Sequence, residues 1–338
     1  MGQTLELRRE SSSERLRLLG ESLGDAEGEV GDKACVYAIG SFGRGEAGQH
    51  SDLDLFIASR MGRSERGSGR VPLLKRLDEI CLKSDIIRAS RKQSFPDFSK
   101  DGRFLMHFSL DSLINNIGHF NDDVENTLTA RLLLLLESRC LIGYGVYDAI
   151  ISKVIDAYWL EFDRHKNDFM PAFIVNDILR LWRTFCINYE MRSEKDEDTD
   201  YVEKKRIKNY KLRQSRMLTC HSAILCLLHG YGTSGTVSPT DFRRIVDLTP
   251  TQRLESVSED ANVDLSIAQQ CKDIIEMYEE FLELTNHSED EMIRIFADPE
   301  QARMRDAKAK LFGEAMFAVM SAVGTRGKAP ALYRMLIV

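Results

Sequence analysis

The sequence lacks several features that mark particular classes of protein. No apolar run approaches the length of a membrane span, since Leu132 to Leu136 is a short leucine run that suits a core helix. The seven cysteines contain no Cys-x-x-Cys pair, so we expect reduced thiols in a cytoplasmic protein rather than a zinc finger. The start, Met1 to Glu10, is polar and charged, which is not the pattern of a signal peptide.

An excess of positive charge is also missing. The 53 Asp and Glu residues outnumber the 46 Lys and Arg residues, which gives a formal net charge of −7. Overall charge is therefore not expected to hold a long nucleic acid, and only local basic patches stay open for that role.

The composition that remains is that of an ordinary globular protein. The 338 residues are 43% hydrophobic and 29% charged, and this length suits about two domains. Strand-like runs come before Asp111, and helical periodicity follows it. We predict an α+β fold in four parts: a leading helix over residues 1–24, a small mixed-sheet domain over 25–112, an α-helical domain over 113–322 and a tail over 323–338.

Local patterns predict several further elements. Thr249 and Asp298 each precede a proline, so we expect each residue to cap the start of a helix. The other expected elements are a loop over 24–33, a basic loop over 60–70, a hairpin over 95–110 and a helix over 171–190.

The chain is organised around residues 35–58. An apolar run ends there in Gly40-Ser41, and an alternating run carries Asp52 and Asp54. Side chains alternate between the two faces of a strand, so the two carboxylates should point the same way. Two neighbouring carboxylates favour a cation, and Mg²⁺ or Mn²⁺ suits their oxygens. The glycine permits a close backbone approach, and the Ser41 hydroxyl with nearby N–H groups could hold a phosphate.

Other glycine motifs fit this stretch less well. Gly43 to Gly48 matches the dinucleotide-binding spacing, but it leads into a strand where that motif opens a helix. P-loop spacing from Gly40 places Glu46 where a lysine is required. A surface hairpin with two aspartates by chance stays open as an alternative.

Residues 35–58 resemble the signature of the DNA polymerase β-like nucleotidyltransferase superfamily. The resemblance implies that Asp52 and Asp54 bind metal ions carrying a nucleoside triphosphate, and that Gly40 and Ser41 contact its phosphates. We include Arg44, which follows the turn, among the expected nucleotide-binding residues. In overall arrangement, the chain is similar to the uridylyltransferase module of the bifunctional enzyme of nitrogen regulation.

The family usually supplies a third carboxylate from the next strand. Asp97, in Pro-Asp-Phe, is the best match, and we expect it to be the third catalytic and metal-binding residue. Asp101 is the second choice, and His107 could occupy the place instead. Without a third carboxylate, nothing obvious would activate the attacking hydroxyl.

Basic residues of the helical part are candidates for neutralising the triphosphate. Arg180 and Arg183 share one face of the helix over 171–190 with Asn176, and they lie close to apolar neighbours. Internal ion pairs, for example to Asp177, are the open alternative. The resemblance extends a general phosphate-binding role to three basic residues of the next segment: Lys208, Lys211 and Arg213.

Together these patterns indicate a metal-dependent nucleotidyltransferase with its active site in a cleft between the two domains. It would transfer a nucleoside monophosphate from a nucleoside triphosphate to a hydroxyl of a protein, an RNA or a small molecule, releasing pyrophosphate. The alternative is a weak or inactive nucleotide-binding regulator, such as a toxin–antitoxin or signalling partner. The base, the acceptor, a homo-oligomer and the docking of the tail are left open.

Overall fold

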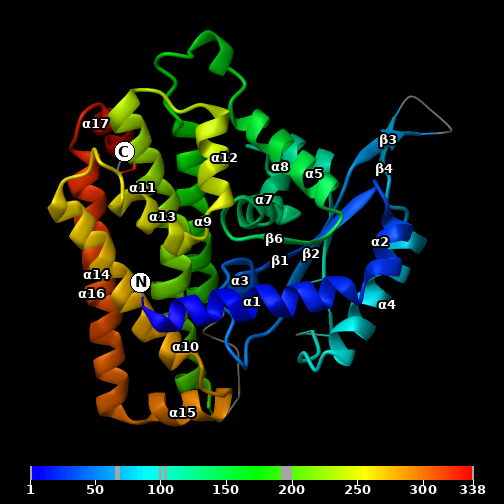
Figure 1. Cartoon of the computed structure of the whole chain (residues 1–338), viewed down its shortest axis with the longest axis horizontal. Helices are drawn as coiled ribbons and strands as arrows, with labels where there is room; N and C mark the ends of the chain where they lie inside the picture. The colour runs from blue at the N-terminus through cyan, green and yellow to red at the C-terminus, as the bar shows by residue number, and fades with distance from the viewer. Residues whose placement is uncertain (1, 65–68, 99–100, 103–104, 192–199, 337–338) are drawn as a thin grey trace. The chain divides into compact units, whose positions relative to one another are not determined.

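The structure of the protein, a computed structural model, describes residues 2–64, 69–98, 101–102, 105–191 and 200–336. The chain divides into two compact units (Figure 1). We call Glu6–Ala157 the sheet unit, and Met1–Leu5 with Tyr158–Val338 the helical unit. A mixed sheet with helices followed by a largely helical region confirms the predicted α+β class.

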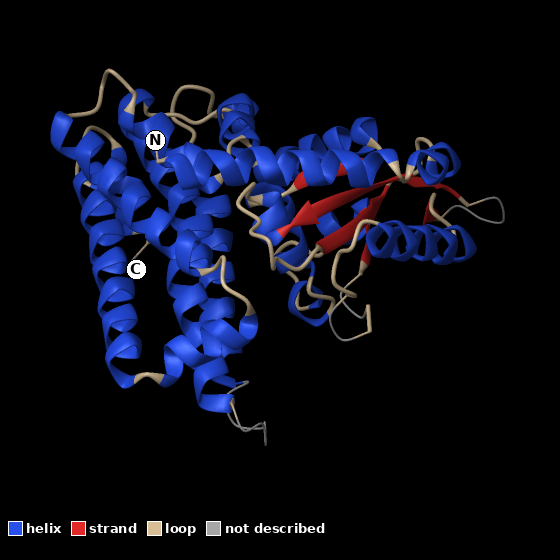
Figure 2. Cartoon of the chain, turned by 60° about the horizontal axis from the view of Figure 1, so that its bottom comes forward, coloured by secondary structure: helices blue, strands red, loops and turns tan. Residues whose placement is uncertain are grey.

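A four-stranded mixed sheet forms the centre of the sheet unit, with the strand order β5-β2-β1-β6 (Figure 2). β1 (Ala34–Ile39) pairs antiparallel with β2 (Asp54–Ser59) and with β6 (Arg139–Ile142). β5 (His107–Ser109) pairs parallel with β2. The Gly-Ser turn and the Asp-x-Asp segment therefore lie together, where β1 ends and β2 begins.

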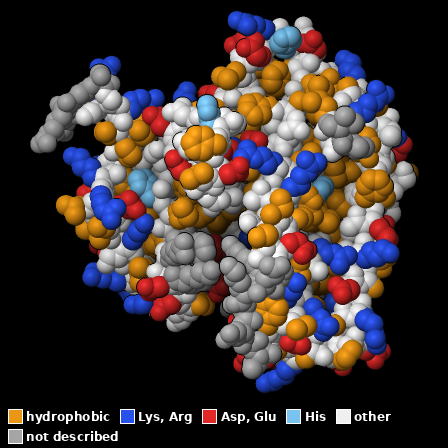
Figure 3. Space-filling view, turned by 180° about the vertical axis from the view of Figure 1, so that it is seen from behind, with side chains coloured by type: hydrophobic (Ala, Val, Ile, Leu, Met, Phe, Trp, Pro, Cys, Tyr) orange, Lys and Arg blue, Asp and Glu red, His pale blue; other side chains and the backbone are white. Residues whose placement is uncertain are grey.

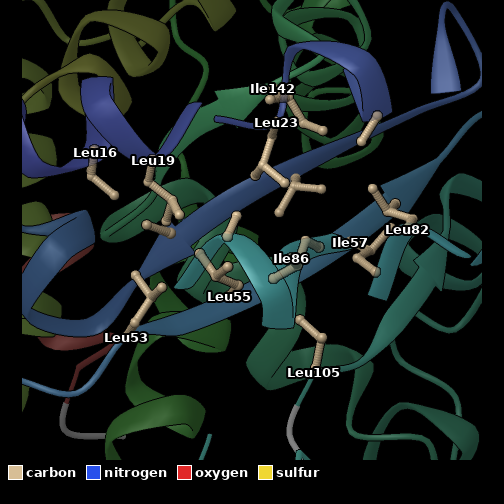
Figure 4. Close-up of a cluster of buried hydrophobic side chains, with 14 of the residues drawn as sticks. Leu16, Leu19, Leu23, Leu53, Leu55, Ile57, Leu82, Ile86, Leu105 and Ile142 are labelled. Atoms are coloured by element: carbon tan, nitrogen blue, oxygen red, sulfur yellow. The ribbon is translucent and has the colours of Figure 1, made fainter. Parts of the chain in front are cut away.

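Helices cover both faces of this sheet. α1 (Gln3–Glu21), α2 (Gly24–Val30) and α4 (Arg76–Lys92) share one buried cluster with the strands. Tyr37 of β1 points the other way and packs against a tyrosine of α8 (Tyr144–Tyr158) at 6.0 Å between ring centroids. Because both faces are covered, every residue of β1 is buried. Figure 4 shows the cluster, whose labelled side chains include Leu16, Leu19, Leu55, Ile57, Leu82 and Ile86.

The other elements of the sheet unit are mostly short. They are α3 (Gly40–Gly43), β3 (Met61–Arg63), β4 (Arg70–Pro72), α5 (Leu110–Asn115), α6 (Asn121–Val124) and α7 (Thr127–Leu136).

The described part of the helical unit consists of helices. They are η1 (Phe162–Arg164), α9 (Ala172–Met191), α10 (Tyr201–Lys211), the π-helical turn η3 (Leu212–Arg216), α11 (Met217–Ser234), α12 (Pro239–Asp247), α13 (Pro250–Ser258), α14 (Leu265–Leu284), α15 (Glu289–Ala297), α16 (Pro299–Gly324) and α17 (Ala329–Arg334). Thr249 and Asp298 cap α13 and α16 through their side chains, as predicted. None of the described helices is both long and apolar enough to cross a bilayer.

Two segments that we predicted as loops contain regular structure. Within 24–33 the chain forms α2, because Ala26 and Val30, four residues apart, are both buried against the sheet. Within 60–70, β3 and β4 pair antiparallel with each other, and 65–68 lies outside the described residues. The sequence of this second segment is rich in Gly and Arg, so it offers no apolar alternation that would predict strands.

The predicted hairpin over 95–110 is wrong for the described residues. They contain one strand, β5, which pairs with β2 and not with its own neighbours in the sequence. β6 was also missed, and it joins the sheet from beyond the predicted boundary at residue 112. Both strands have only three or four residues and distant partners, so no local pattern could reveal them.

Candidate functional site

The Gly-Ser turn lies directly against one of the two motif aspartates. Ile39, the last residue of β1, pairs in register with Asp54, the first residue of β2. Gly40 follows with a φ of 65°, a left-handed conformation that favours glycine. A Cβ atom at this position would lie 2.9 Å from Asp54 Oδ2. The glycine therefore permits the close approach between the turn and the carboxylate, with Ser41 next to it.

Three predicted site carboxylates line one pocket: Asp52, Asp54 and Asp97. Asp52 is exposed and Asp54 is half-buried, whereas the leucines that flank them in sequence are buried, as strand alternation predicts. The pocket encloses about 10 Å³, which is room for about one water molecule or one ion. Its remaining lining is apolar and consists of Leu53, Leu55, Phe98 and Leu105.

Asp97 is held in an exposed ion pair. Arg91 of α4 donates to both carboxylate oxygens, with Nε at 2.7 Å from Oδ1 and Nη2 at 3.0 Å from Oδ2. The hydrogen bond from Arg91 and its charge lower the pKa of Asp97 below its usual value. Among the residues that the structure describes, no three His, Cys, Asp or Glu side chains gather as a ready-made metal cage. The role of Asp97 as a third metal ligand stays a prediction.

The two alternatives to Asp97 lie outside the pocket lining. Asp101 occupies a turn with a φ of 55°. His107 lies on β5, where its Nδ1 is 3.0 Å from Glu79 Oε2 and its Nε2 is 2.8 Å from Ser59 Oγ. This serine, histidine and glutamate have the spacing of a nucleophile, a base and an orienting acid, but Ser59 is fully buried. No substrate could reach its hydroxyl, so the cluster joins α4 to the sheet.

Arg44 does not extend from the turn toward solvent. Its Nε lies 2.5 Å from Glu46 Oε1, and its Nη1 lies 2.8 Å from Glu137 Oε2. The side chains of Arg44, Glu46 and Glu137 are 7%, 3% and 0% exposed. The arginine therefore bridges two buried carboxylates, and this geometry does not support its expected contact with a nucleotide.

Glu137 was missed at the level of sequence. It follows α7, far along the chain, and its backbone oxygen lies 2.0 Å from the position that a Cβ atom would take on Gly43. The turn after β1 and the end of α7 thus touch closely enough to require glycine. No local feature of the sequence marks Glu137, because its partners lie 93 residues away.

Apart from Arg44, the basic residues predicted to bind nucleotide belong to the helical unit. Arg180 lies 3.8 Å from Asp177, which is the internal ion pair that the sequence left open, and Asp177 also accepts a hydrogen bond from a tyrosine. Arg213 lies 3.6 Å from Asp306. The remaining three are exposed, and their role toward a triphosphate stays a prediction: Arg183, Lys208 and Lys211.

The residues at the pocket fit a hard divalent cation delivered with a substrate. Mg²⁺ commonly binds through one or two carboxylates, together with water and substrate phosphates, rather than in an all-protein cage. Asp52 and Asp54 offer two carboxylates beside a turn that carries a hydroxyl and backbone N–H groups. The donor set is therefore right for a metal that arrives with phosphates.

Comparison with known families agrees with this geometry. Residues 22–100 match the model of the nucleotidyltransferase domain, and this range contains the Gly-Ser turn and the aspartates of the pocket. Neither the curated proteins nor the solved structures provided a match to the chain. The narrower resemblance to a uridylyltransferase module receives no support from these comparisons.

Proposed function

We propose that this protein is a metal-dependent nucleotidyltransferase that moves a nucleoside monophosphate from a nucleoside triphosphate to an acceptor hydroxyl. The observation that carries the proposal is the approach of Gly40 to Asp54 at the rim of a pocket also lined by Asp52. The match of residues 22–100 to the nucleotidyltransferase domain supports the reaction class.

In the proposed reaction each group at the turn has one task. Asp52 and Asp54 hold Mg²⁺ or Mn²⁺, which when bound neutralises the triphosphate and the departing pyrophosphate. The Ser41 hydroxyl and the N–H groups of the turn bind phosphate oxygens and set the line of attack. Asp97 lines the same pocket. When its carboxylate separates from Arg91, it can accept the proton of the acceptor hydroxyl.

The identity of the acceptor is the open part of the proposal. Figure 3 shows Lys and Arg side chains interspersed with Asp and Glu over the visible face, which is not a continuous basic surface. Together with the net charge of −7, this favours a hydroxyl of a protein or a small molecule over a long RNA.

The test is a transfer assay with each nucleoside triphosphate labelled at the α-phosphate, with Mg²⁺ or Mn²⁺, and with cell extract as the source of acceptors. We expect Asp52→Asn and Asp54→Asn to lower label transfer by about 10²-fold or more, because each removes charge at the metal. Asp101→Asn is the matched control, since this carboxylate does not line the pocket. Full activity in Asp54→Asn would contradict the proposal.

A second function is favoured by the state of Asp97. Its bidentate ion pair with Arg91 occupies the carboxylate that would accept the proton of the acceptor hydroxyl, and this suits a protein that binds nucleotide without efficient turnover. Thermal stabilisation by one triphosphate with metal, without label transfer to any acceptor, would favour this regulator. An Arg91→Ala variant that gains transfer activity would instead show that the ion pair restrains an enzyme.

A further inference from the structure

The loop between the Gly-Ser turn and the aspartates is held by one face of α1. Three side chains at positions i, i+4 and i+7 of this helix reach three successive residues of the loop. Arg8 Nη1 donates to the Glu46 carbonyl oxygen at 2.8 Å. Ser12 Oγ accepts from the Ala47 N–H at 2.9 Å. Arg15 Nη1 donates to the Gly48 carbonyl oxygen at 3.0 Å. We call these three residues the α1 stripe.

Burial makes these contacts specific. Ser12 and Ala47 are 0% and 2% exposed, so the amide of the loop has no water to replace the serine hydroxyl. The Arg15 guanidinium also lies over the rings of Phe42 and Phe95, at 4.7 and 4.8 Å from their centroids. Phe42 belongs to α3, the short helix that carries Ser41, so one side chain of the stripe touches both the loop and the turn.

The opposite side of the loop is held by the residues described above. Arg44 joins Glu46 to Glu137, and the close contact of Gly43 with the end of α7 leaves no space for a side chain at this position. The loop itself contains Gly45, with a φ of 70°, and a glycine adds conformational freedom that contacts from outside the loop restrict. Local hydrogen bonds, such as those from the Glu46 N–H to the Ser41 carbonyl and from the Gly48 N–H to Ser51 Oγ, are therefore supplemented by contacts from α1 and from the end of α7.

We propose that Arg8, Ser12 and Arg15 are positioning residues of the proposed active site. They do not line the pocket, and all three precede residues 22–100, the range of the nucleotidyltransferase domain. They hold the loop that sets the spacing between the phosphate-binding turn and Asp52. A misplacement of about 1 Å between reacting groups can cost about 10²-fold in rate, so this spacing matters for transfer. The inference rests on the proposed function for its catalytic consequence.

The first measurement is hydrogen–deuterium exchange of the peptide that covers residues 44–51 in the full-length protein. In Ser12→Ala the Ala47 amide loses its acceptor, and we expect its exchange to accelerate by about 10-fold or more. Ser11→Ala is the matched control, because this neighbouring serine is exposed and faces away from the loop. Unchanged exchange at Ala47 in Ser12→Ala would show that α1 does not hold the loop.

The second measurement separates positioning from plain stability. We expect Arg8→Ala and Ser12→Ala to lower transfer at saturating triphosphate by about 10-fold, with a thermal midpoint like that of Ser11→Ala. Arg8→Lys keeps a donor for the Glu46 carbonyl and should recover most of the activity. Faster exchange in the loop with unchanged transfer would overturn the positioning role, and so would a loss that follows the thermal midpoint alone.

A failure of the proposed function can be told apart from a failure of this inference. If the wild type transfers no label, Mn²⁺ binding with each nucleoside triphosphate replaces the activity measurement. Weaker binding in Ser12→Ala than in Ser11→Ala then supports the positioning role without catalysis. If the wild type binds no triphosphate either, the positioning role falls together with the proposed function, and the exchange result still decides whether α1 holds the loop.

Discussion

The buried arginine behind the Gly-Ser turn allows the sharpest prediction about stability. Arg44 bridges Glu46 and Glu137 at 2.5 and 2.8 Å, and all three side chains are at least nine-tenths buried. Arg44→Met keeps an unbranched apolar stem but removes the guanidinium, with its charge and its hydrogen bonds. Two carboxylates then remain in the interior of the sheet unit without the cation that lies between them.

The size of the effect follows from this burial. Removing one partner of a buried ion pair costs about 3–5 kcal/mol, because the remaining charge stays away from water. Here two charges remain, so we expect Arg44→Met to lower the free energy of unfolding by about 4 kcal/mol or more. Glu137→Gln keeps an oxygen for Arg44 and leaves its pair with Glu46, so it should cost only about 1 kcal/mol.

The assay must report on the sheet unit alone. Both tryptophans lie in the helical unit, so tryptophan fluorescence does not follow the sheet. Cys35 of β1 is fully buried, and burial raises the pKa of its thiol far above the usual value. Its labelling by a thiol reagent in increasing urea therefore reports the opening of the sheet. Cys220, which is fully buried in α11, provides the internal reference for the helical unit.

Arg91→Met is the matched control, since it breaks an exposed ion pair of the same unit. Arg91 and Asp97 form this pair through two hydrogen bonds. Its two side chains are 63% and 65% exposed, so solvent screens the pair and its loss should leave the labelling midpoint of Cys35 nearly unchanged. Labelling of Cys35 that responds equally to Arg44→Met and Arg91→Met would refute the argument from burial. A parallel change at Cys220 would mean that the effect is not confined to the sheet unit.

Three further predictions test the close contacts elsewhere in the chain. Gly43→Ala should destabilise the sheet unit by about 3 kcal/mol or more, because the new Cβ would lie 2.0 Å from the Glu137 backbone oxygen. Gly28→Ala is its control: the new Cβ meets open space in α2, and we expect stability to rise by up to about 1 kcal/mol in the same thiol-labelling assay. A hydrogen bond from His229 lowers the pKa of Asp260, so its contribution to stability is complete above the ordinary carboxyl pKa of about 3.9 and is lost as the pH falls through the lowered value. Unfolding followed by tryptophan fluorescence should therefore weaken less with acid in Asp260→Asn than in the wild type, and equal slopes would argue against the pair. His107→Ala should cost about 1–3 kcal/mol in the thiol assay, because it leaves a buried serine hydroxyl without its partner, while nucleotidyl transfer per folded molecule stays unchanged.

The sequence alone was sufficient for the features that depend on neighbours in the chain. The apolar run before Gly40 and the alternation around Asp52 and Asp54 predicted two strands joined by a turn, because strand faces alternate with a period of two. Thr249 and Asp298 predicted helix starts, since a cap bonds to backbone groups only two or three residues away.

Only the tertiary structure decided which partners the charged residues have. In the sequence Arg44 is a cation beside a phosphate-binding turn, and nothing local indicates that Glu137, 93 residues away, takes up its charge. The α1 stripe was overlooked for the same reason: Arg8 and Ser12 interrupt a row of buried leucines, and the loop that they bond lies more than thirty residues further along. Local periodicity fixes the face on which a side chain lies, but the partner of a buried polar group depends on how distant segments pack.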